Sequence, residues 1–178
     1  KAFSGNTNIL GVVMPDSVTV INKNAFNGCN RLSSVTLSSN LTTVEYGAFQ
    51  ECTSLTAIMI PKSLTTASMW YDNYGVFTNA GLKEVTFEKG TTSIAPYLFA
   101  NCESLEEITI PDTVTTIGKY AFSHAKGLKQ IAIPDAVTSI GEGAFTGCVA
   151  LQSAKIGSAV KTIGISAFSD CVHLEEIK

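Results

Sequence analysis

Cysteine, histidine and glutamate are the side chains of this 178-residue chain that could do chemistry. Thiolates and imidazoles ligate metals or act as nucleophiles and bases, and two facing carboxylates can hydrolyse a glycosidic bond. Each of these activities needs several groups that converge on one point. The spacing of the candidate residues therefore decides which activities are open to the chain.

All five cysteines occupy one position of an internal repeat, three residues after a phenylalanine. They are Cys29, Cys52, Cys102, Cys148 and Cys171, and alanine (Ala80, Ala125) takes the same position in two other units. A column that alternates between cysteine and alanine favours a small, buried packing position, because a free thiol behaves as a small apolar group. Neighbouring strands lie about 4.7–4.9 Å apart, so disulfides Cys29–Cys52 and Cys148–Cys171 are the alternative. Cys102 has no cysteine in either adjacent unit, which favours free thiols throughout.

Histidine and glutamate show no catalytic arrangement. His124 and His173 belong to different columns and have no Ser, Cys or Glu partner at a meaningful spacing. The adjacent glutamates 106–107 and 175–176 lie on predicted strands, where neighbouring side chains point to opposite faces. No H-E-x-x-H, G-x-S-x-G, Cys-x-x-Cys or glycine-rich phosphate loop occurs. The sequence therefore predicts no catalytic residue, no metal ligand and no cofactor, and the chain is not expected to be an enzyme.

Phenylalanine defines the repeat to which these residues belong. Eight of the nine phenylalanines occupy one position, and most of them are 23 residues apart: Phe3, Phe26, Phe49, Phe77, Phe99, Phe122, Phe145 and Phe168. Each of these phenylalanines is followed in register by a leucine, an apolar pair, a proline, an apolar-Thr-x-apolar run and a glycine, with exceptions in several units. The unit reads L-x-x-I-x-I-P-x-x-V-T-x-I-G-x-x-A-F-x-x-C-x-x.

Each part of this unit predicts a local structure. The L-x-x-I-x-I segment suits a short strand beside its copies in a parallel sheet, and proline ends that strand. The V-T-x-I run predicts a second extended piece on the opposite side, and Gly118, Gly141 and Gly164 predict turns with positive φ. A-F-x-x-C predicts one helical or 3₁₀ turn whose phenylalanine stacks on those of neighbouring units. One unit cannot bury its apolar side alone, so stability must come from stacking.

This pattern resembles the BspA-like (Treponema-type) leucine-rich repeat, from Phe3 to Ile177. The resemblance implies a leucine-rich repeat solenoid, a right-handed coil with a parallel β-sheet on its concave face. Short strands and 3₁₀ or helical turns would form the convex side. We expect a single domain over residues 1–178, with about seven to eight units and truncation at both ends.

Composition narrows the range of partners. The net charge is −3, so no basic footprint for nucleic acid is present. No apolar stretch approaches the roughly 20 residues of a transmembrane helix, so we expect no membrane insertion.

An insertion at residues 69–75 is the first candidate contact surface. It contains Trp70, Tyr71 and Tyr74, and aromatic side chains are enriched at binding hot spots. Because the insertion follows the apolar-Thr-x-apolar run, we expect it on the convex side or at an edge. A bulge that folds back over its own coil is the alternative.

The concave sheet is the second candidate surface. We expect two outward columns, one with Glu84 and Glu107 and the other with Met59, Thr86 and Thr109. We expect this face to be flat, rich in small residues and mostly neutral, with an acidic patch around Glu84, Glu106 and Glu107. Such a face suits a broad protein contact better than a deep small-molecule pocket. A plain solvated face is the alternative.

The resemblance implies a secreted or surface-attached protein whose repeats serve adhesion or protein binding. We expect a protein partner, such as a host extracellular-matrix or cell-surface protein, and some end-to-end or edge self-association. A rigid spacer that holds other domains of a larger cell-surface protein is the alternative function.

Overall fold

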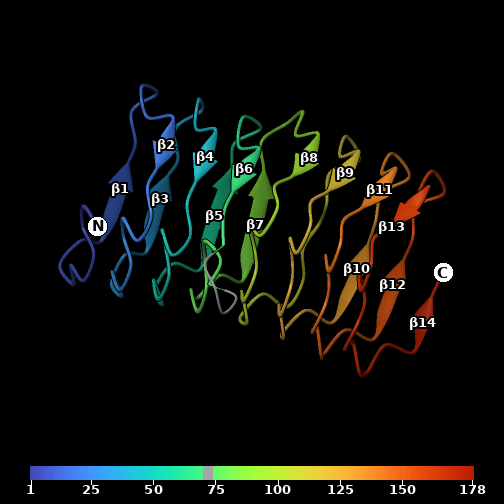
Figure 1. Ribbon diagram of the computed structural model, residues 1–178. Coiled ribbons are helices and arrows are strands. Elements are labelled where there is room, and N and C mark those ends of the chain that lie inside the picture. The colour runs from blue at the N-terminus through green and yellow to red at the C-terminus, as the bar shows by residue number, and fades with distance from the viewer. Residues whose placement is uncertain (70–73) are drawn as a thin grey trace.

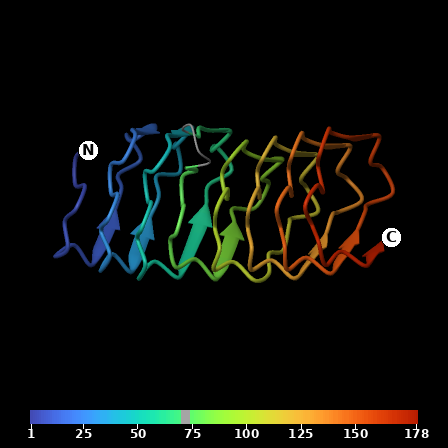
Figure 2. The ribbon, with the colours of Figure 1, turned by 60° about the horizontal axis from the view of Figure 1, so that its bottom comes forward.

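The computed structural model describes residues 1–69 and 74–178 and shows a parallel β-solenoid. Successive coils lie side by side along one axis, and the two termini lie at opposite ends (Figure 1). Each coil contributes short extended segments on two sides, which form two series of strands along the axis (Figure 2). The predicted solenoid architecture is confirmed.

The first series comes from the L-x-x-I-x-I segments. Its strands are β1 (Gly11–Val13), β3 (Ser34–Thr36), β5 (Ala57–Ile60), β7 (Glu84–Phe87), β10 (Gln130–Ala132), β12 (Ser153–Lys155) and β14 (Glu176–Ile177). The register places equivalent residues of successive units opposite each other, as in the pair Ile131–Ala154. We call the solvent side of this series the strand face.

The second series comes from the V-T-x-I runs. Its strands are β2 (Val20–Ile21), β4 (Thr43–Val44), β6 (Thr66–Ala67), β8 (Ser93–Ile94), β9 (Thr116–Ile117), β11 (Ser139–Ile140) and β13 (Thr162–Ile163). The predicted second extended piece is therefore present in every full coil.

Both series are interrupted. The first series forms the separate sheets β1-β3, β5-β7 and β10-β12-β14, and the second forms β2-β4-β6 and β8-β9-β11-β13. The segment Glu107–Ile110 occupies the place of a strand between β7 and β10, but it has no strand pairing. The sheet is thus a row of parallel pieces rather than one continuous ladder.

Phenylalanine rings run through the core as one stack. Successive centroids lie 5.1 to 6.1 Å apart from Phe3 to Phe168, with nearly parallel planes. The five central rings are almost fully buried: Phe49, Phe77, Phe99, Phe122 and Phe145. The predicted inward stack is confirmed, and each of these five rings is covered by the coil before it and the coil after it.

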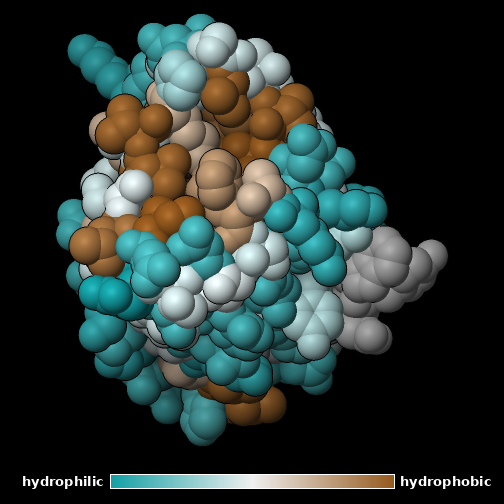
Figure 3. Space-filling model, turned by 90° about the vertical axis from the view of Figure 1, so that its left-hand side faces the viewer, coloured by the Kyte–Doolittle hydropathy of each residue, from teal (hydrophilic) through white to brown (hydrophobic). Residues whose placement is uncertain are grey.

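The two end coils leave part of this core uncovered. Phe3 is 48% exposed, and Leu10 and Val20 are also exposed at the N-terminal end. Figure 3 looks onto that end, where apolar side chains gather amid a polar rim. At the other end Ile165 and Ile177 are exposed.

The A-F-x-x-C turn is hydrogen-bonded but not helical in the described residues. Ala121 N donates to Gly118 O (3.3 Å) and Ala125 N donates to Phe122 O (3.0 Å). Tyr120 in the first of these turns and His124 in the second have positive φ (53° and 55°), and most coils repeat this pattern. Consecutive right-handed residues are needed for a 3₁₀ helix, so the predicted helical turn is replaced by two linked turns.

The repeated glycine has a different role from the predicted one. Gly118, Gly141 and Gly164 do not have positive φ, so that prediction is wrong. A Cβ on Gly118 would lie 2.5 Å from Pro96 N, and one on Gly141 would lie 2.5 Å from Lys119 N. Glycine is required here because the main chains of adjacent coils approach too closely for a side chain.

We predict that Gly118→Ala lowers the free energy of unfolding by about 1–3 kcal/mol, since the new methyl group overpacks against backbone. Gly11→Ala is the matched control, because a Cβ there meets only ordinary contacts at 3.7 Å. It should change stability by less than about 0.5 kcal/mol. Urea denaturation measures both, and equal effects would contradict the close-approach explanation.

Candidate functional site

The strand face presents the two columns of side chains that the sequence predicts. Met59, Glu84, Thr86, Glu107 and Thr109 are all exposed. The residues between them point inward, and Ile58, Val85 and Ile131 are buried. Alternation along each short strand therefore brings these five candidates onto one surface.

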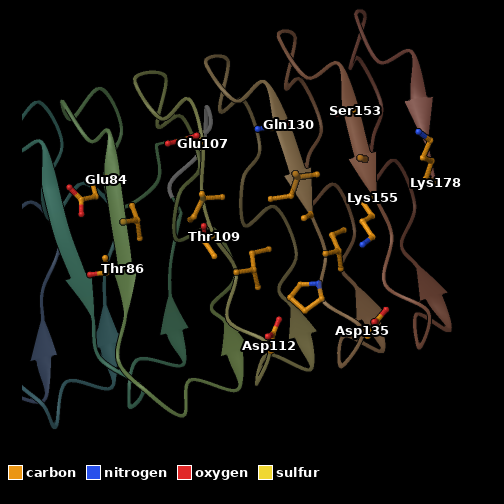
Figure 4. Close-up of a pocket in the computed structure, with 18 of the residues that line it drawn as sticks. Glu84, Thr86, Glu107, Thr109, Asp112, Gln130, Asp135, Ser153, Lys155 and Lys178 are labelled. Carbon is orange, nitrogen blue, oxygen red and sulfur yellow. The ribbon is translucent and has the colours of Figure 1, made fainter.

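The C-terminal half of this face is hollowed into a groove of about 970 Å³ that runs from β7 to β14. Side chains from successive coils line it, as Figure 4 shows. The labelled lining residues are Glu84, Thr86, Glu107, Thr109, Asp112, Gln130, Asp135, Ser153, Lys155 and Lys178. The face is thus less flat than expected, and the hollow is open along several coils.

Four charged residues of the groove were missed by the sequence analysis: Lys83, Asp112, Asp135 and Lys178. For the two aspartates the available signal was the repeated Pro-Asp dipeptide, at 111–112 and 134–135, directly after the strand positions. Asp135 Oδ1 accepts a hydrogen bond from Ser158 N (2.7 Å), and this bond lowers the pKa of Asp135. That carboxylate is therefore fixed at the end of the groove by the next coil.

The members of the predicted acidic patch differ in their ion pairing. Glu106 pairs with Lys129, which lowers the pKa of Glu106. Glu84 and Glu107 have no ion-pair partner within the described parts of the chain. These two carboxylates line the groove, and they are available to a cationic group of a partner.

From the sequence, the two side chains of each adjacent glutamate pair were expected to point to opposite faces of the sheet. The structure does not show this arrangement. Glu106 and Glu107 are both exposed, and so are Glu175 and Glu176. The first residue of each pair precedes the strand position and lies at the corner of the coil, where strand alternation does not apply. Glu107 alone of the first pair joins the outward column with Glu84.

Of the three aromatic residues of the insertion, the structure describes only Tyr74. Trp70 and Tyr71 lie outside the described residues. Tyr74, which is 40% exposed, follows the second-series strand β6 and does not line the groove. Tyr74 is therefore separate from the groove, and the insertion needs its own test.

Sequence analysis also missed a pair of tyrosines on the turn side. The rings of Tyr97 and Tyr120 stack at 5.7 Å, and Lys119 Nζ lies 5.3 Å from the Tyr97 centroid. Tyr120 Oη donates to Glu142 Oε1 (2.8 Å), which raises the pKa of Tyr120. Their shared position, two residues before the column phenylalanine, was the signal. Each polar tip has a partner within the cluster, which is consistent with a clamp between coils.

The cysteines are buried and free, as the alternation with alanine favoured. Four of the thiols lie 3.1–3.2 Å from the phenylalanine carbonyl of the preceding unit, as Cys52 Sγ does from Phe26 O. Burial raises the pKa of Cys52 and of Cys148 to about 12. These side chains remain neutral thiols near pH 7 and join coils instead of acting as nucleophiles.

Within residues 1–69 and 74–178, no three His, Cys, Asp or Glu side chains are grouped to hold a metal ion. The same residues contain no helix with the length and apolar character of a membrane span.

The buried thiols predict a loss of stability at alkaline pH. Their pKa is higher in the folded state than in the unfolded state, so their contribution is complete below about pH 9 and is lost as pH rises toward 12. Chemical denaturation between pH 8 and 12 should show this fall. A Cys52→Ala/Cys148→Ala variant should show a shallower fall, and parallel curves for variant and parent would exclude the thiols as the cause.

Comparison with known proteins identifies the repeat. The family model described as BspA type Leucine rich repeat region matches residues 1–71 and 73–178 in six copies. A search of curated proteins finds no match.

Two solved structures are similar over nearly the whole chain. A leucine-rich repeat protein from Bacteroides ovatus is 26% identical with a TM-score of 0.70, and the match covers 98% of this chain and 50% of that protein. The Treponema pallidum leucine-rich repeat protein is 26% identical with a TM-score of 0.58, and the match covers 98% of this chain and 69% of that one. The chain thus spans half the length of the Bacteroides protein.

Proposed function

We propose that this chain, which belongs to the BspA-type leucine-rich repeat family, is a protein-recognition module that binds its partner on the strand face. The groove over β7 to β14 is the observation that carries the proposal, because it exposes side chains from several successive coils along one open surface. An elongated hollow of this kind suits a protein partner that contacts many coils at once.

The charges of the groove support a protein partner with basic side chains. Glu84, Glu107 and Asp112 line it without an ion-pair partner among the described residues. Lys83, Lys155 and Lys178 line the same groove, but five carboxylates outnumber them: Glu84, Glu107, Asp112, Asp135 and Glu176. Complementary charges of this kind mainly set orientation and association rate, while the neighbouring Thr86, Thr109 and Met59 supply neutral contact area.

We place the module in a secreted or surface-attached protein with an adhesive role, as the family resemblance implies. A host extracellular-matrix or cell-surface protein is the class of partner that we would examine first. No catalytic step is proposed. The rigid spacer is the competing function, and binding measurements distinguish the two, because a spacer has no partner on the strand face.

We predict that charge reversal in the groove, Glu84→Lys with Glu107→Lys, weakens partner binding at least tenfold, which corresponds to about 1.4 kcal/mol. The reason is that both carboxylates would face the partner's basic groups. Glu51→Lys with Glu175→Lys is the control, since it makes the same change in net charge at exposed sites outside the groove. Binding would be measured by biolayer interferometry against purified extracellular-matrix and cell-surface proteins.

Each outcome bears on a different part of the proposal. Equal binding by the two variants would remove the strand face as the site. Trp70→Ala with Tyr71→Ala would then test the insertion, together with Tyr74→Ala. If the parent protein bound nothing on a broad array, the recognition role itself would be contradicted and the spacer would be favoured.

We further propose weak end-to-end association. The exposed apolar side chains of the two end coils, such as Phe3 and Ile177, support it. Sedimentation velocity at increasing concentration measures it, and a constant monomeric sedimentation coefficient would refute it.

A further inference from the structure

One junction between coils, the one that joins the Phe77 coil to the Phe99 coil, is looser than the others. Its ring centroids lie 6.1 Å apart, whereas the other neighbouring rings of the column lie 5.1–5.4 Å apart. The thiol contact is also longer here, at 3.6 Å from Cys102 Sγ to Phe77 O, against 3.1–3.2 Å elsewhere. The ring stack and the thiol contact are thus both longer at this junction than at the others.

On the turn side of this junction, the described residues make fewer backbone hydrogen bonds between coils than at a regular junction. At the regular Phe122–Phe145 junction three amides donate to the next coil: Tyr120 N to Glu142 O (2.8 Å), Phe122 N to Ala144 O (2.8 Å) and His124 N to Thr146 O (2.7 Å). At the looser junction, among the residues that the structure describes, Asn79 N is the one turn amide that does so, and it donates to Asn101 O (3.2 Å), one residue out of register. Gly75 N donates to Thr78 Oγ1 within its own coil.

The strand side of the junction is unpaired as well, a break that the first series also has between β3 and β5 and between Glu107–Ile110 and β10, where the turn-side hydrogen bonds are kept. Across the described coils, no backbone hydrogen bond joins β7 to the segment Glu107–Ile110. Of the three sides of the coil, only the second series is continuous here, through the pairing of β8 with β9. Ile108 is only partly buried, whereas Val85 and Ile131 in the coils on either side are buried; the counterparts Val12 and Val35 near the N-terminal end are partly buried as well.

The sequence supplies physical causes for this looseness. Phe77 and Phe99 are 22 residues apart instead of 23, so the turn register cannot match on both sides. Phe87 stands where the next two coils have Ile110 and Ile133, and its ring meets Phe99 edge-on at 6.2 Å and 90°. The bulky Phe87 ring at the end of β7 therefore lies between this coil and the next, and we call this ring the wedge.

We propose that the Phe77–Phe99 junction is the conformational joint of the solenoid, where the coils separate first. In a stacked repeat the stability is close to a sum of nearest-neighbour terms, so the interface with the fewest contacts opens most readily. The groove is built across this joint, with Glu84 and Thr86 on one side and Glu107 and Thr109 on the other. Opening therefore changes the shape of the candidate binding surface, a consequence that rests on the proposed function.

Hydrogen–deuterium exchange of the free protein tests the joint. Peptides that cover Glu107–Ile110 should exchange at least tenfold faster than those that cover β12, which is paired on both sides. Phe87→Ile should slow the exchange of Glu107–Ile110, since it removes the wedge. Leu37→Ile is the matched control, because it introduces the same residue at the equivalent position of a distant coil and should change nothing at 107–110.

The parent measurement decides the proposal even if a variant folds poorly. Slow exchange at Glu107–Ile110, equal to that of β12, would overturn it. An equal response to Phe87→Ile and Leu37→Ile would also overturn the wedge as its cause. No partner is present in this experiment, so its failure would leave the proposed recognition role standing, and the failure of binding would leave the joint standing.

Discussion

The stacking of each coil on its neighbours is the interaction on which the rest of the structure depends. A single coil has only two strands of two to four residues, too few to fold alone. Burial of the phenylalanine column becomes complete only where coils lie on both sides, as for Phe49 and Phe122, whereas Phe3 at the end remains half exposed. Stability and length are therefore linked, because each added coil completes the burial of the previous one.

This constraint separates the residues that maintain the solenoid from those free to take on a function. The inward columns tolerate only apolar or small side chains, and glycine is required wherever main chains approach as closely as at Gly118. The outward columns of the strand face carry no such requirement. They range from Gly11 and Ala57 to Glu84, Glu107 and Lys155. Recognition can therefore be encoded on the strand face without a change in the fold.

The repeated columns of the sequence predicted the solenoid, the phenylalanine stack, the free buried thiols and the outward residues of the strand face. Each of these depends on periodicity and burial, which a repeated sequence displays directly. Features that depend on contacts between particular coils could not be predicted. The left-handed φ of Tyr120, the backbone approach at Gly118 and the unpaired segment Glu107–Ile110 arise from how adjacent main chains fit together. The groove could not be predicted either, because it is formed by side chains of several coils whose relative placement the sequence does not give.

Comparison of Phe122→Ala with Phe3→Ala in urea denaturation tests the primacy of stacking most directly. Phe122 is fully buried between two neighbouring rings, whereas Phe3 stacks on Phe26 alone. The account predicts a loss of about 3–5 kcal/mol in the free energy of unfolding for Phe122→Ala, and less than half of that for Phe3→Ala. Similar losses for the two variants would contradict it, because the contribution of the ring would then not depend on the coils that enclose it.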